Sequence, residues 1–305
     1  MKNLLATILL AAPLLADFNY ESKTRFTGGS LLPALSEKQP LDKPIVATHM
    51  IKGTRMATIT KGRTIVVDLG PQTILEMNFA KKTYSLMTFA QMKEILDRAM
   101  KSRKDPATAI YKIDSKPSGG TKAFGFFNAR ELVVSMTLDA AAQATPQSAA
   151  HVLVDTWHFT MPGFGEAEDF RAKLAEKLSP AYASGLSATG ILEPELLPAF
   201  EEFGKLINPG DDMPVQTTIR IGNPTSGDLG PIPERPAPQK GVVSGTISRI
   251  GSLTHKKSAP AEDPEALYPG LLLELTTELS NFGSGPADEV KFNVPEGFKQ
   301  SQPPH

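Results

Sequence analysis

Hydrophobic and polar residues alternate in short stretches between residues 45 and 88. Five stretches are rich in β-branched residues, and brief polar or glycine-bearing connections separate them. The stretches are Ile45–Ile51, Arg55–Thr60, Thr64–Leu69, Thr73–Phe79 and Thr83–Met87. Because parallel strands need connections of a dozen residues or more, these stretches predict an antiparallel meander. A further mixed aromatic and β-branched stretch, Asp17–Thr27, predicts an earlier strand.

The periodicity changes after Thr88. Apolar residues then recur three or four positions apart, at Phe89, Met92, Leu96 and Met100, which predicts an amphipathic helix. Threonine is a residue type that caps helix N-termini, so the helix is expected to begin after Thr88.

Two further helices are predicted in the second half. One covers Glu166–Leu178, with acidic residues at its start and lysines near its end, as the helix dipole favours. The other runs from near Pro194 to about Ile207 and carries Phe200 on its apolar stripe.

The remaining patterned stretches predict strands. They are Tyr111–Ser115, Lys122–Phe127, Ala129–Leu138, Val152–Met161, Val215–Ile221, Val242–Leu253 and Leu271–Phe282, followed by a tail around Phe292–Phe298. Ala140–Ala150 is alanine-rich with one proline and is interpreted as a loop.

The connection at residues 223–239 holds five prolines and two glycines. A domain boundary there would leave only two long strands, 242–253 and 271–282, on the far side, and two strands are marginal alone. We therefore expect residues 17–305 to form one domain, with the strands of 242–282 added to the main sheet. The fold class is α+β: a strongly curved antiparallel sheet, an open half-barrel, covered by amphipathic helices.

The first 16 residues have the pattern of a secretory signal peptide. Lys2 supplies the positive charge, Leu4–Ala12 the apolar region, and Ala16 a small residue before the expected cut. The apolar stretch is too short to span a bilayer, which needs about 20 residues. We expect a periplasmic or secreted protein with no transmembrane segment after cleavage.

Composition narrows the function classes. The 32 basic and 33 acidic residues nearly cancel, which removes the whole-protein electrostatic case for nucleic-acid binding. The chain has no cysteine, so disulfides, thiolate metal sites and cysteine nucleophiles are excluded.

Motifs for catalysis or cofactor binding are weak. The five histidines have no metal-ligand spacing, and the chain contains neither a phosphate loop nor a G-x-S-x-G motif. Asp155 and His158 are the closest acid–histidine pair, but residues three apart face opposite sides of a strand. No metal or cofactor is predicted.

Methionine and aromatic residues are the remaining candidates for a site. Methionine adapts to irregular shapes and is common on surfaces that accept varied apolar ligands, although core filling explains the same residues. The candidate cavity-lining residues are Met77, Phe79, Met87, Phe89, Met92, Met136, Trp157, Phe159 and Met161.

Several strings in a fixed order resemble a family of uncharacterised exported bacterial proteins. They are Lys52-Gly53-Thr54-Arg55-Met56, Thr64–Leu69, Lys82–Thr88, Trp157 with Pro162-Gly163 and Glu166, Pro214-Val215, and Phe292–Lys299. The first half of such proteins is similar in layout to the periplasmic lipoprotein carriers LolA and LolB. The resemblance implies an open half-barrel closed by helices over an apolar cavity, with the helices of Phe89, Phe170 and Phe200 as its lid. It transfers no ligand-contacting residue.

Two function classes follow. The first is a non-catalytic envelope protein that binds an acyl chain, a lipoprotein anchor or an apolar peptide, so a lipid or lipoprotein is the expected partner. The second is a structural or regulatory interaction protein with a filled core. A hydrolase ranks third, because no motif supports it.

Overall fold

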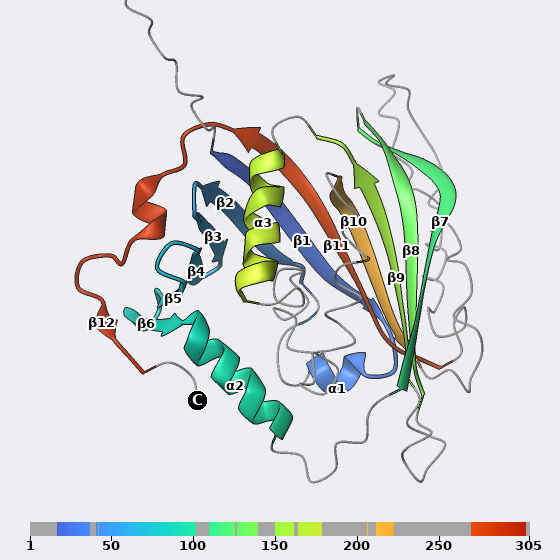
Figure 1. Ribbon diagram of the computed structural model, residues 1–305, viewed down its shortest axis with the longest axis horizontal. Coiled ribbons are helices and arrows are strands. Elements are labelled where there is room, and N and C mark those ends of the chain that lie inside the picture. Colours follow the sequence, from blue (N-terminus) through green and yellow to red (C-terminus); the bar gives the residue numbers. More distant parts are fainter. Residues whose placement is uncertain are drawn as a thin grey trace, which may run out of the picture.

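The computed structural model describes residues 17–36, 41, 43–101, 110–125, 127–139, 150–161, 164–178, 206, 212–222 and 270–302. Their strands are β1 (Phe18–Gly28), β2 (Ile45–Lys52), β3 (Arg55–Thr60), β4 (Arg63–Asp68), β5 (Thr73–Asn78), β6 (Thr83–Thr88), β7 (Ile110–Phe124), β8 (Phe127–Asp139), β9 (Ala150–Phe159), β10 (Met213–Gly222), β11 (Leu271–Ser284) and β12 (Lys299–Gln300). They form one large, curved and unclosed sheet, in the order β12-β6-β5-β4-β3-β2-β1-β11-β10-β9-β8-β7 (Figure 1). All neighbours are antiparallel except the short β12–β6 pair.

The predicted meander is confirmed. β2 to β6 are consecutive neighbours, joined by two-residue or four-residue connections. Gly53 and Gly62 sit in these turns with φ of 57° and 81°, a conformation that glycine adopts without steric cost. The alternation of the sequence therefore becomes two distinct faces of this half of the sheet.

One prediction for the second half of the chain is wrong. Tyr111–Ser115 and Lys122–Phe127 were expected as separate strands, whereas β7 is continuous and turns into β8 after Phe124. The proline-glycine stretch between them is absorbed as a register shift between Pro117 and Thr121. β7 is an edge strand, where a missing backbone donor and an irregular pairing are tolerated.

β11 lies in the middle of the sheet. It pairs with β1 on one side and with β10 on the other. A strand near the C-terminus thus joins the N-terminal meander to β7–β10, and the described strands form a single sheet.

Within the described residues, three α-helices accompany the sheet: α1 (Leu32–Ser36), α2 (Phe89–Lys101) and α3 (Gly165–Lys177). The predicted start of α2 is confirmed by a capping box. The Gln91 backbone N–H donates to Thr88 Oγ1 over 3.2 Å, and the Thr88 N–H donates back to Gln91 Oε1 over 2.8 Å. In Figure 1, α3 crosses one face of the sheet over β1 and β2.

We call this side the α3 face. Phe164, Phe170 and Leu174 pack there against sheet residues that include Phe18 and Ile51. Phe89 of α2 belongs to the same buried cluster, so both described helices of the expected lid contribute to one core.

The opposite side of the meander is the tail face. Residues 285–302 cross it, with the 3-10 helix η5 (Glu289–Phe292) and then β12. Phe292 is buried there against Ala57, Val66 and Met77. Removing these apolar surfaces from water is the main stabilising contribution of the tail.

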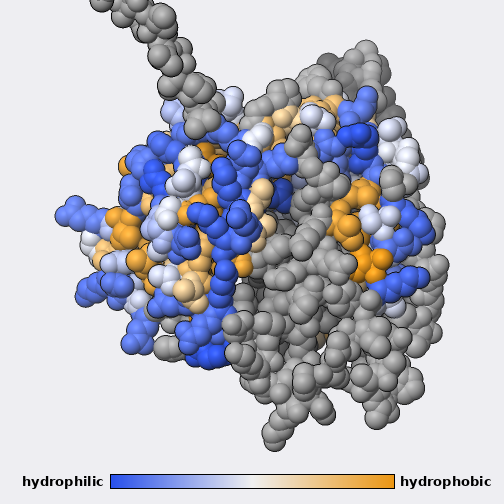
Figure 2. Space-filling view, viewed as in Figure 1, coloured by the Kyte–Doolittle hydropathy of each residue, from blue (hydrophilic) through white to orange (hydrophobic). Residues whose placement is uncertain are grey.

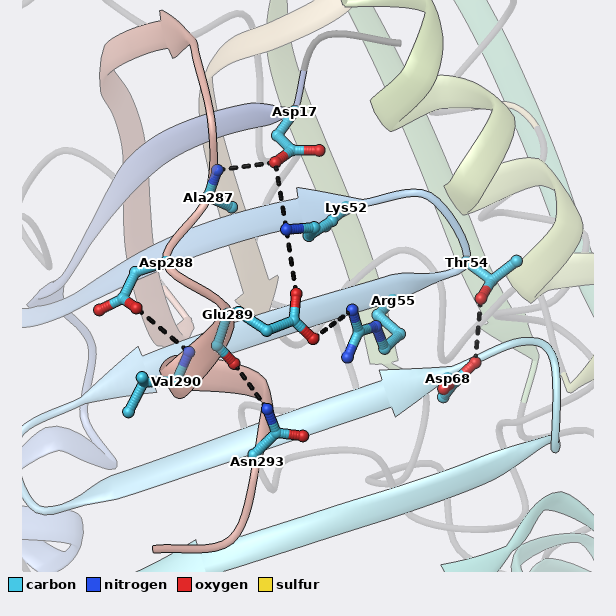
Figure 3. A network of polar contacts seen from close by, with 10 residues as sticks. All are labelled: Asp17, Lys52, Thr54, Arg55, Asp68, Ala287, Asp288, Glu289, Val290 and Asn293. Atoms are coloured by element: carbon cyan, nitrogen blue, oxygen red, sulfur yellow. Dashed lines mark hydrogen bonds and ion pairs between the residues drawn. The ribbon is translucent and has the colours of Figure 1, made fainter. Parts of the chain in front are cut away.

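Polar contacts fix the tail in place (Figure 3). Glu289 forms ion pairs with Lys52 at 2.9 Å and Arg55 at 2.7 Å. The carboxylate of Asp17 accepts from the Ala287 N–H over 2.7 Å. Lys52 also pairs with Asp17, so the start of β1 and the tail are both held beside the β2–β3 turn at one end of the meander.

Several predictions fall outside the described residues: the signal peptide at 1–16, most of the loop at 140–150, most of the helix at 194–207, the connection at 223–239 and the strand at 242–253.

Candidate functional site

The α3 face changes character along β1. Phe18 lies in the cluster under α3, whereas Phe26, near the other end of the strand, pairs with Leu275 of β11. Between them, Tyr20, Ser22 and Thr24 present polar groups to the same face, because alternate residues of a strand share a side. A polar band thus separates two apolar regions.

The second apolar region is built from two cross-strand rows on β8 to β11. Most of these side chains are buried, and Val134, Met136 and Val154 have no exposed surface. The rows are Leu275, Ile219, Val154 and Val134, and Leu273, Ile221, Val152 and Met136. We call them the aliphatic rows.

Hydroxyl groups form much of the band between the apolar regions. Thr24 and Thr277 Oγ1 atoms lie 2.9 Å apart, and those of Thr156 and Thr217 lie 3.2 Å apart. Register places Thr277 beside Thr217, so the four threonines run across β1, β11, β10 and β9. With Ser22 and Thr58 they make up what we call the hydroxyl band.

A histidine joins the hydroxyl band on the neighbouring strands. His49 Nε2 lies 2.8 Å from Ser22 Oγ, and His49 Nδ1 lies 3.2 Å from Thr58 Oγ1. The Tyr20 ring stacks on the imidazole, with centroids 4.5 Å apart and planes at 13°. Both imidazole nitrogens are therefore within hydrogen-bond distance of hydroxyls, and one ring face is covered.

Burial and a nearby cation keep this imidazole neutral. Desolvation, followed by the positive charge of Arg171 on α3, lowers the pKa of His49 to about 4. Desolvation raises the pKa of Tyr20, against an opposing effect of the same Arg171 charge. At neutral pH the site holds an uncharged imidazole and an uncharged phenol.

A buried charged cluster occupies the opposite face of β9 to β11. Arg220 Nε donates to Glu274 Oε2 over 2.7 Å, and Thr27 Oγ1 donates to Glu274 Oε1 over 2.5 Å. Asp155 lies on the same face and is 5% exposed. Burial, then the Glu131 charge, raises its pKa to about 7, while Arg220 opposes the rise. The cluster lies across the sheet from the aliphatic rows.

The nine candidate cavity residues do not form one group. Phe89, Met92 and Met161 pack in the cluster under α3. Met77 is buried on the tail face, and Phe79, 45% exposed, packs edge-on against Phe298.

The remaining candidates lie on other strands. Trp157 and Phe159 belong to a separate cluster with Ala129 and Val215. Met136 lies in an aliphatic row, and Met87 is buried opposite Ile74 on the meander. Of the nine, Met136 alone lies within the aliphatic rows.

Asp155 and His158 lie on opposite faces of β9, as their spacing predicted. His158 is buried on the α3 face, where desolvation lowers its pKa against the opposing influence of Asp212. The two residues therefore do not form a catalytic pair.

Sequence reasoning missed the contact between Ser22 and His49. Each residue sits in a correctly predicted strand, but 27 positions separate them. Alternation assigns each residue to a face of its own strand, while the β1–β2 register decides which residues meet. The sequence offered one signal for this contact, a histidine in a stretch of strands that carry serine and threonine. That pattern is common and does not identify the residue that the histidine contacts.

Two sequence comparisons with known proteins found no match. No family profile matches the chain, and no curated protein matches it in sequence. Within the described ranges, no helix is long and apolar enough to cross a membrane. Those same residues contain no group of three or more carboxylate or histidine side chains placed to hold a metal ion.

Proposed function

We propose that the protein binds an apolar ligand on the α3 face of its sheet, as a soluble envelope protein with an open half-barrel lidded by helices. The ligand class is an acyl chain, a lipoprotein anchor or an apolar peptide. The observation that supports this is the pair of aliphatic rows bordered by the hydroxyl band on a curved, unclosed sheet.

The two surfaces suit the two parts of an acyl ligand. Each buried methylene contributes about 0.8 kcal/mol, so about ten methylenes against the aliphatic rows would favour binding by roughly 8 kcal/mol before ordering costs. The hydroxyl band offers donors and acceptors to an ester or carboxyl group, which would otherwise lose its hydrogen bonds with water.

Lipid recovery tests the proposal directly. Protein purified from the cell envelope should carry lipid visible by native mass spectrometry, and delipidated protein should bind a fluorescent fatty acid. A protein that stays empty after exposure to envelope extract would contradict the proposal.

A pair of matched variants locates the site. Ile219→Thr puts a hydroxyl in an aliphatic row, whereas Leu153→Thr does so on the opposite face of the neighbouring strand. The two residues are 7% and 6% exposed, so both changes should destabilise the fold similarly. Fatty-acid affinity should fall with Ile219→Thr and stay near wild type with Leu153→Thr.

One observation favours the second candidate function, a structural or regulatory interaction protein. Val134, Met136 and Val154 have no exposed surface, which is also what a filled core requires. A stable envelope complex recovered by crosslinking, with no bound lipid, would support this function instead.

A further inference from the structure

Ser22, His49 and Thr58 form a hydroxyl–imidazole–hydroxyl chain across three adjacent strands. The two contacts measure 2.8 Å and 3.2 Å. All three side chains are half-buried, so they are held in place and still accessible. The proposed binding role uses the hydroxyls of Ser22 and Thr58 as part of the hydroxyl band, but it does not require the imidazole of His49 between them.

The arrangement has the contacts that activate a serine. When His49 Nδ1–H donates to Thr58 Oγ1, the Nε2 lone pair faces the Ser22 hydroxyl and accepts its proton. The stacked Tyr20 ring limits rotation of the imidazole. Burial lowers the pKa of His49 to about 4, so the imidazole is neutral at pH 7 and can accept a proton, as a weaker base than an ordinary histidine.

The positive charge of Arg171 on α3 acts on both His49 and Tyr20. Since the Ser22 hydroxyl contacts His49, an oxyanion formed beside Ser22 would also experience a positive field. Such charge stabilisation is commonly a large contribution to acyl transfer.

We propose that Ser22 and His49 are a nucleophile–base pair that hydrolyses carboxylic esters, with Thr58 as the positioning residue for the imidazole. Ser22 Oγ attacks the ester carbonyl carbon and its proton passes to His49 Nε2. The ester C–O bond breaks, and His49 returns the proton to the departing alcohol oxygen. Water then attacks acyl-Ser22 through the same base, which releases the carboxylic acid and restores the Ser22 hydroxyl.

Covalent labelling tests the nucleophile. A fluorophosphonate probe should add one equivalent to the wild-type protein by intact mass, and peptide mapping should place it on Ser22. The adduct should disappear in Ser22→Ala. It should persist in Ser135→Ala, because Ser135 is a half-buried strand serine on the opposite face. An adduct absent from Ser22 would overturn the proposal.

Turnover of p-nitrophenyl acetate tests the base and its positioning residue. Ser22→Ala and His49→Gln should each lower kcat/KM by about 10²–10⁴-fold. Thr58→Val should lower kcat more than KM, and Thr58→Ser should restore it, with circular dichroism confirming the fold. Hydrolysis that survives Ser22→Ala at the wild-type rate would count against the pair.

The short ester keeps this proposal separate from ligand binding. The acetyl group is too small to need the aliphatic rows, so esterase activity without fatty-acid affinity would contradict only the proposed function. Fatty-acid binding without labelling or turnover would contradict only the nucleophile–base pair.

Discussion

The half-buried His49 and the buried Asp155 give the molecule opposing pH dependences. The pKa of His49 is lowered to about 4, so its stability contribution is present above its ordinary value of 6.5 and is lost as pH falls through about 4. The pKa of Asp155 is raised from 3.8 to about 7, so its contribution is present below 3.8 and is lost as pH rises through about 7. Between pH 4 and 6.5 the two slopes partly cancel.

Asp155→Asn should separate these two effects. Asparagine keeps the neutral form at every pH, so the variant should exceed the wild type in free energy of unfolding above pH 7, by an amount on the order of a few kcal/mol. Its stability should rise with pH from 4 to 6.5, because the His49 contribution remains. Denaturant unfolding followed by circular dichroism from pH 4 to 8 measures both.

Asp114→Asn is the control for that variant. Asp114 lies on β7, and its contact with Lys116 lowers rather than raises its pKa. The change should therefore not produce a gain in stability at alkaline pH. If Asp155→Asn also shows no gain in the free energy of unfolding above pH 7, the pKa of Asp155 is not raised as described.

Single elements owe their placement to different physical causes. α2 carries its own start signal in Thr88 and Gln91, so local chemistry determines where it begins. η5 has only one turn, and its place depends on Phe292 and on the ion pairs of Glu289.

Substitutions within η5 should separate burial from surface effects. Phe292→Ala should cost about 3–5 kcal/mol of unfolding free energy, because the side chain is 3% exposed among Ala57, Val66 and Met77. Val290→Ala, in the same turn, should change it by less than about 0.5 kcal/mol because Val290 is 70% exposed. Urea unfolding measures both; similar losses would mean that Phe292 is not what holds the tail.

The central position of β11 makes the whole sheet depend on a segment near the C-terminus. β1 and β10 are separated by this strand, so each loses a neighbour without it. If β11 is displaced, its buried residues Leu271, Leu273 and Leu275 become exposed to water. If β11 is deleted, the side chains that pack against these leucines become exposed instead.

Nested truncations should reveal this dependence. A chain ending at residue 285 keeps β11 and loses the tail, so it should fold with a lower melting temperature. A chain ending at residue 270 loses β11 and should show no cooperative unfolding transition by circular dichroism. Native-like cooperative melting of the shorter chain would show that the two halves of the sheet fold independently.

Local patterns predicted most of the described elements. The meander, α2 and α3 follow from period-two or helical periodicity and from connections too short for crossovers. β7 was misread because Pro117 and its glycines signal a break, which an edge strand can absorb.

The candidate site was less predictable than the fold. The methionine and aromatic candidates are apolar and mostly buried, but apolar character does not specify which cluster a side chain joins. Ser22 meets His49 through strand register, and no single segment records that register.

The sequence by itself determined most of the described strand and helix segments, the faces of those strands, the near-neutral charge and the absence of disulfides, because these depend on residue type and short-range spacing. Tertiary structure alone decided that β11 enters between β1 and β10, that the tail buries Phe292, and that Ser22, His49 and Thr58 meet. These outcomes are contacts between distant segments, and they form only when the whole sheet selects its strand order and register.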